Sequence, residues 1–390
     1  MAGFELIDDN ELNEIIDIFK NGGVFFRHGF ESLRNECFKV AQFEREFAKK
    51  LGVKNSLAVT SGTAALRVAL AALDIGAGDE VIAPSFTFVA TVEAIIESGA
   101  TPVCCEIDQS LNMDPSDLER LITNKTKAII AVHMLGTPAD LVPILDVCKK
   151  YGLFLIEDTA WGCGGRLNGK PLGTWGDVGT FSFDYAKTIT TGEGGMVVCK
   201  SEKIHNKAAA WHDHGHENNP LVPRWEDTRS SPGFNFRMTE LQGAVGLAQL
   251  RKLEKIINLQ RHNKDKIVKE LRKIGGLNFR KEPEKTFDTA DALVIFAPDR
   301  EIALQCRENL LRENLGTKIL PEAYSWHFAA TWEHLPQLAQ SHGNNLKNAF
   351  PRSHAIISKA VSIPINVFMD EDIPEKVSRA VGGAFLGKKL

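Results

Sequence analysis

The sequence has no long apolar run and few of the features that mark membrane or secreted proteins. No stretch approaches the ~20 apolar residues that a helix needs to cross a bilayer. The N-terminus, MAGFELIDDNEL, is acidic, whereas a signal peptide is basic and then apolar. The seven cysteines are an odd number without CxxC spacing, which argues against a disulfide framework. These absences predict a cytoplasmic protein with reduced thiols.

An excess of charge of either sign is also missing. The formal net charge of -4 gives no electrostatic reason to expect nucleic-acid or membrane partners. A composition of 43% hydrophobic and 25% charged residues is typical of a globular protein. The 390 residues are too many for one small core and suit a large domain plus a smaller one.

Between residues 57 and 199, short apolar stretches alternate with helical patterns. This alternation predicts an α/β fold with a mostly parallel sheet covered by helices on both faces. The expected strands cover residues 57–60, 80–83, 101–105, 128–132, 153–156, 178–183 and 195–199, and the expected helices cover 64–73, 89–97, 114–121 and 140–151.

The domain organisation follows from the flanking segments. Residues 1–274 are predicted to form the large domain, with an N-terminal helical arm and a long linking helix over 238–274. Residues 275–390, after Gly275-Gly276, are predicted to form a small αβ domain. The polar segment 211–236 is too long for a simple turn and is predicted to be a functional loop.

A candidate phosphate site lies where the first strand meets a helix. Ser61-Gly62-Thr63 precedes the helix, and the free N–H groups of a helix N-terminus favour an anion. Gly62 allows close backbone approach, and Thr63 adds a hydroxyl. An ordinary N-cap is the alternative interpretation of the same residues.

Two further candidates follow strand ends. Phe88 comes after the strand that ends near Pro84, where an aromatic ring can stack on a planar cofactor; a core phenylalanine is the alternative. Asp158 ends an apolar strand, where a carboxylate is costly to bury without a cationic partner such as a pyridinium nitrogen. The alternative is a helix cap or a surface acid.

Lys187 is the residue on which the functional hypothesis depends. It follows a strand and precedes the loop Gly192-Glu193-Gly194-Gly195, and Ser182 stands five residues before it. A neutral lysine amine can form a Schiff base with an aldehyde cofactor and can then carry a proton between two carbons. A solvated surface lysine is the alternative for any single lysine, and only the order of the pieces argues against it.

Histidines alternate in His212-Asp213-His214-Gly215-His216. Alternating histidines can bind zinc, but no other cysteine or histidine completes a plausible ligand set. We therefore expect no metal and favour substrate contact or a structural role.

Several motifs together resemble the DegT/DnrJ/EryC1/StrS sugar aminotransferases, which are fold-type-I enzymes with a seven-stranded-type sheet and pyridoxal 5'-phosphate. The resemblance spans most of the chain. It rests on Ser61-Gly62-Thr63-Ala64-Ala65-Leu66, Pro84-Ser85-Phe86-Thr87-Phe88, Val132-His133, Glu157-Asp158, Phe181-Ser182-Phe183, Lys187, Gly192-Glu193-Gly194-Gly195 and Asn235-Phe236-Arg237-Met238.

The resemblance implies a role for each candidate. Lys187 would be the Schiff-base lysine, Asp158 the partner of the pyridine nitrogen, and Phe88 the stacking ring. Cofactor phosphate would be held by Thr63, Ala64 and Ser182, and by Asn235 of a neighbouring subunit in a homodimer with shared active sites. Trp161 stands where the family often has Gln or His against the ring hydroxyl, which is a departure from the pattern.

Within the family, Asp213-His214-Gly215-His216, Phe26-Arg27, Arg34-Asn35 and Trp326-His327 are similar to the members that convert oxidised Kdo, a lipopolysaccharide sugar acid, to 8-amino-Kdo. L-Glutamate would be the amino donor. Candidate substrate contacts are Arg27, His214, His216, Arg237, Trp326 and His327.

Other functions remain open on the sequence alone. The acceptor is a nucleotide-linked keto-sugar in one alternative. A second is a pyridoxal phosphate-dependent sugar dehydratase, although related dehydratases have histidine at the position of Lys187. A third is a cofactor-binding regulator without catalytic activity.

Overall fold

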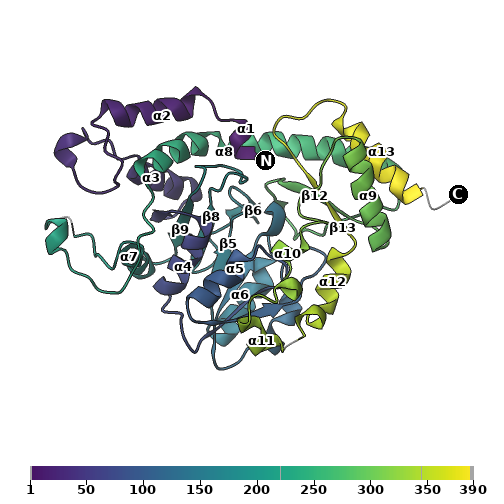
Figure 1. Cartoon of the computed structure of the whole chain (residues 1–390), viewed down its shortest axis with the longest axis horizontal. Helices are drawn as coiled ribbons and strands as arrows, with labels where there is room; N and C mark the ends of the chain where they lie inside the picture. The colour runs from purple at the N-terminus through teal and green to yellow at the C-terminus, as the bar shows by residue number, and fades with distance from the viewer. Residues whose placement is uncertain (1, 220, 344, 387–390) are drawn as a thin grey trace.

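The structure is a computed structural model that describes residues 2–219, 221–343 and 345–386. Its centre is a seven-stranded sheet with helices on both faces (Figure 1). The strand order is β1-β9-β8-β5-β4-β2-β3. The strands are β1 (Ser56–Val59), β2 (Glu80–Pro84), β3 (Thr101–Cys105), β4 (Thr126–Val132), β5 (Phe154–Asp158), β8 (Val178–Ser182) and β9 (Gly195–Cys199).

The sheet is mostly parallel, as predicted. Strands β3, β2, β4, β5 and β8 pair in parallel along the row, whereas β9 runs antiparallel to both β8 and β1. These strands are apolar along most of their length because helices cover both of their faces.

Helices cover both faces of the sheet. One face packs against α4 (Gly62–Ala72) and α5 (Ala90–Glu97). The other packs against α3 (Lys39–Leu51), α6 (Leu141–Tyr151) and α8 (Glu240–Leu271). The alternation of side chains along each strand divides the buried residues between the two faces.

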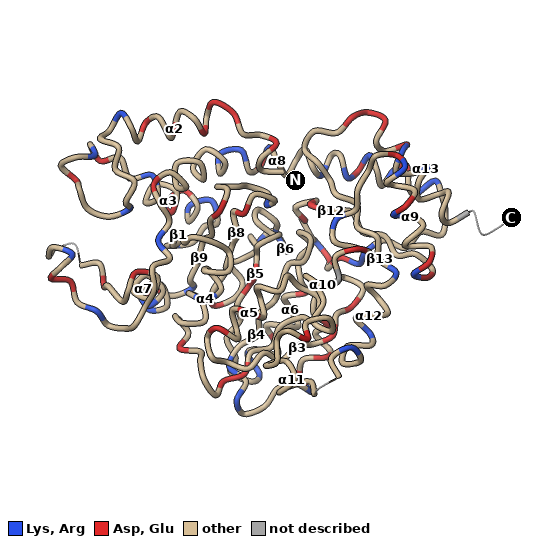
Figure 2. The backbone as a smooth tube through the Cα atoms, viewed as in Figure 1, with Lys and Arg blue, Asp and Glu red and all other residues tan. Residues whose placement is uncertain are grey.

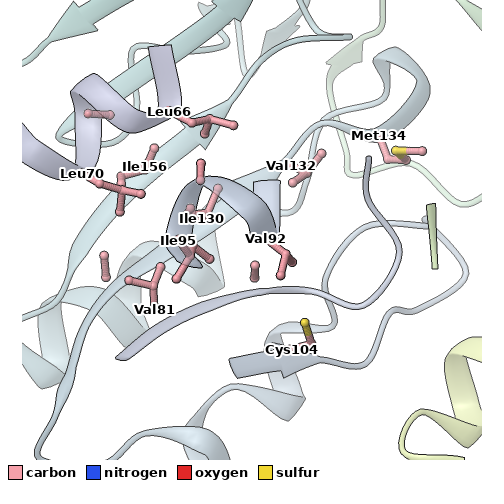
Figure 3. Close-up of a cluster of buried hydrophobic side chains, with 14 of the residues drawn as sticks. Leu66, Leu70, Val81, Val92, Ile95, Cys104, Ile130, Val132, Met134 and Ile156 are labelled. Atoms are coloured by element: carbon pink, nitrogen blue, oxygen red, sulfur yellow. The ribbon is translucent and has the colours of Figure 1, made fainter. Parts of the chain in front are cut away.

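The core of the first face is seen in close-up in Figure 3. Leu66 of α4 and Val92 of α5 pack over Ile130 and Val132 of β4 and Ile156 of β5. All five side chains are at most 3% exposed. This core fixes the N-terminus of α4 beside the carboxyl ends of the strands.

The long helix α8 joins two hydrophobic cores. It was expected over 238–274; the α-helix covers Glu240–Leu271, and a 3₁₀ turn follows at Arg272–Ile274. Thr239 caps it in a capping box with Gln242, which fixes its start. Its last turns pack in a separate cluster with β12, β13, α9 and α13.

The C-terminal cluster contains an antiparallel sheet in the order β10-β12-β13. Its elements are β10 (Asn278–Phe279), β12 (Ala292–Phe296), β13 (Ala360–Pro364), α9 (Arg300–Arg312) and α13 (Ile373–Leu386). Side chains between Leu320 and Ile357 pack instead on the α4–α5 core. The division after residue 274 stays a prediction.

The remaining elements are short or peripheral. They are α1 (Ala2–Glu5), α2 (Asp9–Lys20), α7 (Glu202–Trp211), α10 (Tyr324–His327), α11 (Gln337–His342), α12 (Pro351–Ile357), β6 (Arg166–Leu167), β7 (Lys170–Pro171) and β11 (Thr286–Phe287). Basic and acidic residues are interspersed along α9 and α13 (Figure 2). No helix in the described part of the chain is long and apolar enough to cross a membrane.

The helix expected over residues 114–121 is wrong. The segment forms two 3₁₀ turns, Pro115–Asp117 and Glu119–Leu121. The carboxylate of Asp117 accepts the N–H of Glu106 at 3.0 Å and so ties the first turn to the end of β3. A segment this short gains little from an α-helical nucleus.

The packing of α3 on α8 gives a stability test. A Cβ added at Gly243 would lie 2.7 Å from the backbone nitrogen of Val40, so Gly243→Ala forces the helices apart. We expect a loss of ~1–3 kcal/mol. A Cβ added at Gly382 in α13 would lie 3.6 Å from its nearest atom. The matched change Gly382→Ala should therefore stabilise the folded protein by ~0.4–1 kcal/mol. Melting temperatures that move in the same direction would contradict this packing.

Candidate active site

The carboxyl ends of β5 and β8 and the N-terminus of α4 surround a cavity of about 430 Å³. Ligand sites of α/β sheets form at this edge. Most of the predicted site residues line the cavity together, although they come from distant parts of the chain: Gly62, Thr63, Phe88, Asp158, Trp161, Ser182, Lys187, Trp326 and His327.

Lys187 lies in the turn after β8, and its Nζ is 3.4 Å from the centre of the Trp161 ring. Its backbone oxygen accepts the N–H of Gly3, which ties the turn to the N-terminal arm. Burial lowers the pKa of the Lys187 amine to about 8, against the opposing effect of Asp291 and Asp184. A substantial part of the amine is therefore neutral near physiological pH.

Asp158, the last residue of β5, is 6% exposed. Its carboxylate accepts the Thr91 hydroxyl at 2.9 Å and the Ala160 N–H at 3.2 Å. Burial raises the pKa of this carboxyl, while the two hydrogen bonds lower it. Its neighbour Glu157 does not line the cavity, and its carboxylate accepts backbone N–H groups, including that of Gly173 at 2.8 Å.

Sequence reasoning missed Thr87 and Thr91. The two hydroxyls are 2.8 Å apart and continue the hydrogen bond to Asp158. Thr91 lies in the first turn of α5, whereas Thr87 precedes the helix, so no helical spacing in the sequence indicated that the two hydroxyls meet.

The N-terminus of α4 is built for close approach. A Cβ at Gly62 would lie 2.7 Å from the Cβ of Ser182, so only glycine fits there. Ser61 caps the helix by accepting the N–H of Ala64 at 3.0 Å. The N–H of Ala64, which was expected to hold the cofactor phosphate, is therefore already used by this cap. The N–H groups of Gly62 and Thr63 in the first turn are left for a ligand.

An aromatic wall lies at the mouth of the cavity. The ring centre of Phe88 is 5.5 Å from that of His327 and 6.2 Å from that of Trp326. The N–H groups of Thr87 and Val89 donate to the backbone oxygens of His327 and Trp326, at 2.9 and 3.0 Å. Trp326 and His327, which the sequence offered as substrate contacts, thus line the cavity.

Lys318 and Asp291 were also missed. Lys318 Nζ is 2.5 Å from Asp291 Oδ1 and 4.9 Å from the Trp161 ring centre. The next residue, Ile319, lines the cavity with a φ of +70°, which is unusual for a β-branched residue. No spacing in the sequence indicates that this segment meets Trp161.

The other predicted residues lie outside the cavity of their own chain. Arg27 donates to Glu44 at 2.8 Å, Arg237 pairs with Asp213, and His216 faces Asp227 at 3.1 Å. Asn235 bridges to the backbone of Asp213, and His214 lies in the same loop with a φ of +55°. The position of Asn235 outside the cavity of its own chain is compatible with the expectation that it binds the cofactor phosphate of a neighbouring subunit. That expectation stays a prediction.

The histidines of residues 212–216 have separate environments. His212 is buried, which lowers its pKa to about 3, and its Nδ1 faces the backbone oxygen of Ala209. His216 pairs with Asp227. Among the described residues, no three metal-ligating side chains are grouped.

Comparison with known proteins defines the class. The DegT/DnrJ/EryC1/StrS aminotransferase family matches residues 31–382, and the chain belongs to this family. Its members depend on pyridoxal 5'-phosphate, so the chain is a pyridoxal phosphate-dependent sugar aminotransferase.

Individual proteins agree with this assignment. The chain is 37% identical over 361 residues to GDP-perosamine synthase of Vibrio cholerae, covering 92% of this chain and 91% of that protein. It is 32% identical over 394 residues to the spore coat polysaccharide biosynthesis protein SpsC of Bacillus subtilis, covering 96% and 94%. The crystal structure of 3-amino-5-hydroxybenzoic acid synthase matches with a TM-score of 0.83 and 27% identity, over 98% and 97% of the two chains.

The lowered pKa of Lys187 can be tested by competitive acetylation of the cofactor-free protein. Only a neutral amine reacts, so labelling of Lys187 should rise with a midpoint near pH 8. Peptide mass spectrometry with the exposed Lys200 as internal reference measures it. A midpoint above pH 10 for Lys187 would contradict a desolvated amine.

Proposed function

We propose that this enzyme transfers the amino group of L-glutamate to a keto- or aldehydo-sugar used in a cell-surface polysaccharide or lipopolysaccharide. The single observation that carries the proposal is the meeting of the Lys187 amine and the Asp158 carboxylate in one cavity. The lysine favours amination over the dehydratase alternative.

The residues present fit the cofactor. Asp158 is a buried carboxylate suited to a protonated ring nitrogen, and Gly62 leaves the space that a phosphate needs beside Ser182. Phe88 and Trp161 would flank the ring, and Thr63 and Ser182 would hold the phosphate. Bound pyridoxal phosphate supplies an electron sink for the carbon that loses its proton.

Lys187 would carry the proton. Its neutral amine accepts the proton from the α-carbon of the donor, and the resulting ammonium returns a proton on the cofactor side. The Trp161 ring at 3.4 Å from Nζ limits where this amine moves and excludes water from it. The same steps in reverse order would aminate the sugar carbonyl.

Lys318 is our candidate for the donor carboxylate. Lys187 is the only lysine or arginine among the described residues that line the cavity. Lys318 does not line it and pairs with Asp291, but its Nζ lies 4.9 Å from the centre of the Trp161 ring, which does. In this chain Arg27 and Arg237, the candidates from the sequence, are paired with acids outside the cavity.

Two acceptors are supported by different observations. For oxidised Kdo, three of the four segments that carry the sequence resemblance lie together: Arg34 donates to Phe26 O at 2.8 Å, and His28 Nε2 lies 3.4 Å from the Asp213 carboxylate. For a nucleotide-linked keto-sugar, the support is the similarity to proteins named GDP-perosamine synthase. Oxidised Kdo is our first choice.

A homodimer is part of the proposal. The loop 211–236 exposes large apolar side chains, with Leu221 89% and Trp225 84% exposed, which is unusual for a surface that stays in water. We propose that this loop covers the cavity of a second copy and brings Asn235 to its phosphate.

The acceptor is tested by incubating the enzyme with L-glutamate and either oxidised Kdo or a GDP-linked keto-sugar, and by measuring 2-oxoglutarate. We expect turnover with oxidised Kdo and none with the Lys187→Ala control. Turnover with the GDP-sugar alone would assign the second acceptor. Failure of both would contradict the sugar class proposed here.

The role of Lys318 is tested by Lys318→Met. Loss of a charge-assisted contact with the donor should raise the KM for L-glutamate ~10–100-fold with a smaller change in kcat. Lys318→Arg should restore part of the affinity, and Lys347→Met, which removes a surface charge near Glu333, is the matched control. A KM unchanged in Lys318→Met would remove Lys318 from the donor site.

A further inference from the structure

A second cavity, of about 290 Å³, lies between α8 and the β10-β12-β13 sheet. It shares no lining residue with the cavity around Lys187. Four cationic side chains line it, Arg261, Lys264, Arg272 and Arg280, together with three acidic ones, Asp265, Glu282 and Asp288. None of them has a role in the proposed transamination.

Arg280 is the unusual member of this set. It is 9% exposed, and its Nε donates to the backbone oxygen of Ser110. Its Nη1 and Nη2 are both buried and have no hydrogen-bond partner among the described residues. Burial lowers the pKa of this guanidinium to about 10, so it is still charged at neutral pH. A buried cation without a partner is costly.

The acids near Arg280 are engaged elsewhere or too far away for a hydrogen bond. Asp288 forms ion pairs with both Arg261 and Lys264, and Lys264 also pairs with Glu282 at 3.2 Å. Asp108 accepts the N–H of Ser110 at 2.7 Å. Asp291 is paired with Lys318.

Arg272 stands at the exposed rim and has no side-chain partner in the described ranges. Arg272 and Arg280 are therefore the two cations of this cavity that form no ion pair among the described residues. Their planar guanidinium groups match the geometry of carboxylate and phosphate oxygens.

We propose that this cavity is a second ligand site, which binds a small metabolite through a phosphate or carboxylate group held by Arg280 and Arg272. Phe279, Val268 and Leu293 form an apolar wall that would receive the body of such a ligand. Two consecutive residues link this cavity to the one around Lys187. Asp288 lines this cavity, and Thr289 donates to the backbone oxygen of Trp161, which lines the other, at 3.2 Å.

The test is isothermal titration of the cofactor-loaded enzyme with inorganic phosphate and, separately, with citrate at equal ionic strength. Loading with cofactor keeps the probes out of the proposed phosphate site at α4. We expect saturable binding of at least one probe, weakened at least tenfold in Arg280→Met and in Arg272→Met. The probe that binds more tightly identifies the oxyanion class.

Lys273→Met is the matched control, because it removes one exposed positive charge from the residue next to Arg272. It should bind the probes like the wild type. Binding that is unchanged in Arg280→Met, or absent for both probes in the wild type, would overturn the proposal.

Folding of the Arg280 variant has its own measurement. Since the guanidinium is unpaired without ligand, Arg280→Met should keep or raise the melting temperature in chloride buffer and lose the rise that phosphate gives the wild type. A large fall in chloride together with an unchanged phosphate effect would mean that Arg280 is structural.

Discussion

The proposed active site depends on keeping one buried carboxylate and one desolvated amine in the same cavity. Asp158 is held by the Thr91 hydroxyl and the Ala160 N–H, so its position does not rely on the lysine. Burial of Lys187 lowers the pKa of its amine to about 8. Burying either group alone in an apolar interior would be costly. Both would become useful once a cofactor with a basic ring nitrogen and an aldehyde is bound in the cavity.

The fold supplies this arrangement through the edge of a parallel sheet. Asp158 and Ser182 are the last residues of β5 and β8, two neighbouring parallel strands, so their side chains reach the same edge. The α4 helix begins at this edge because Ser61 caps it and Gly62 lies against Ser182. The C-terminal part of the chain returns through Trp326-His327 to form the mouth of the cavity.

The sequence was sufficient for the parts that depend on local patterns. The alternation of apolar strands and helices predicted the sheet. Strand ends, together with the family resemblance, predicted nine of the residues that line the cavity. It was insufficient where the chain meets itself at long range. Lys318 pairs with Asp291 and contacts Trp161 through the packing of the C-terminal segment, and no periodicity encodes those contacts. The 114–121 helix failed because the side chain of Asp117 bonds to the backbone of β3 and overrides the helical pattern.

The central claim, that Lys187 and Asp158 serve bound pyridoxal phosphate in an amino transfer from L-glutamate, is tested most directly by the visible spectrum of the purified protein. We expect a yellow absorbance band that bleaches on addition of L-glutamate and that is absent in Lys187→Ala. A wild-type protein that takes up no pyridoxal phosphate, or a band that L-glutamate leaves unchanged, would contradict the account.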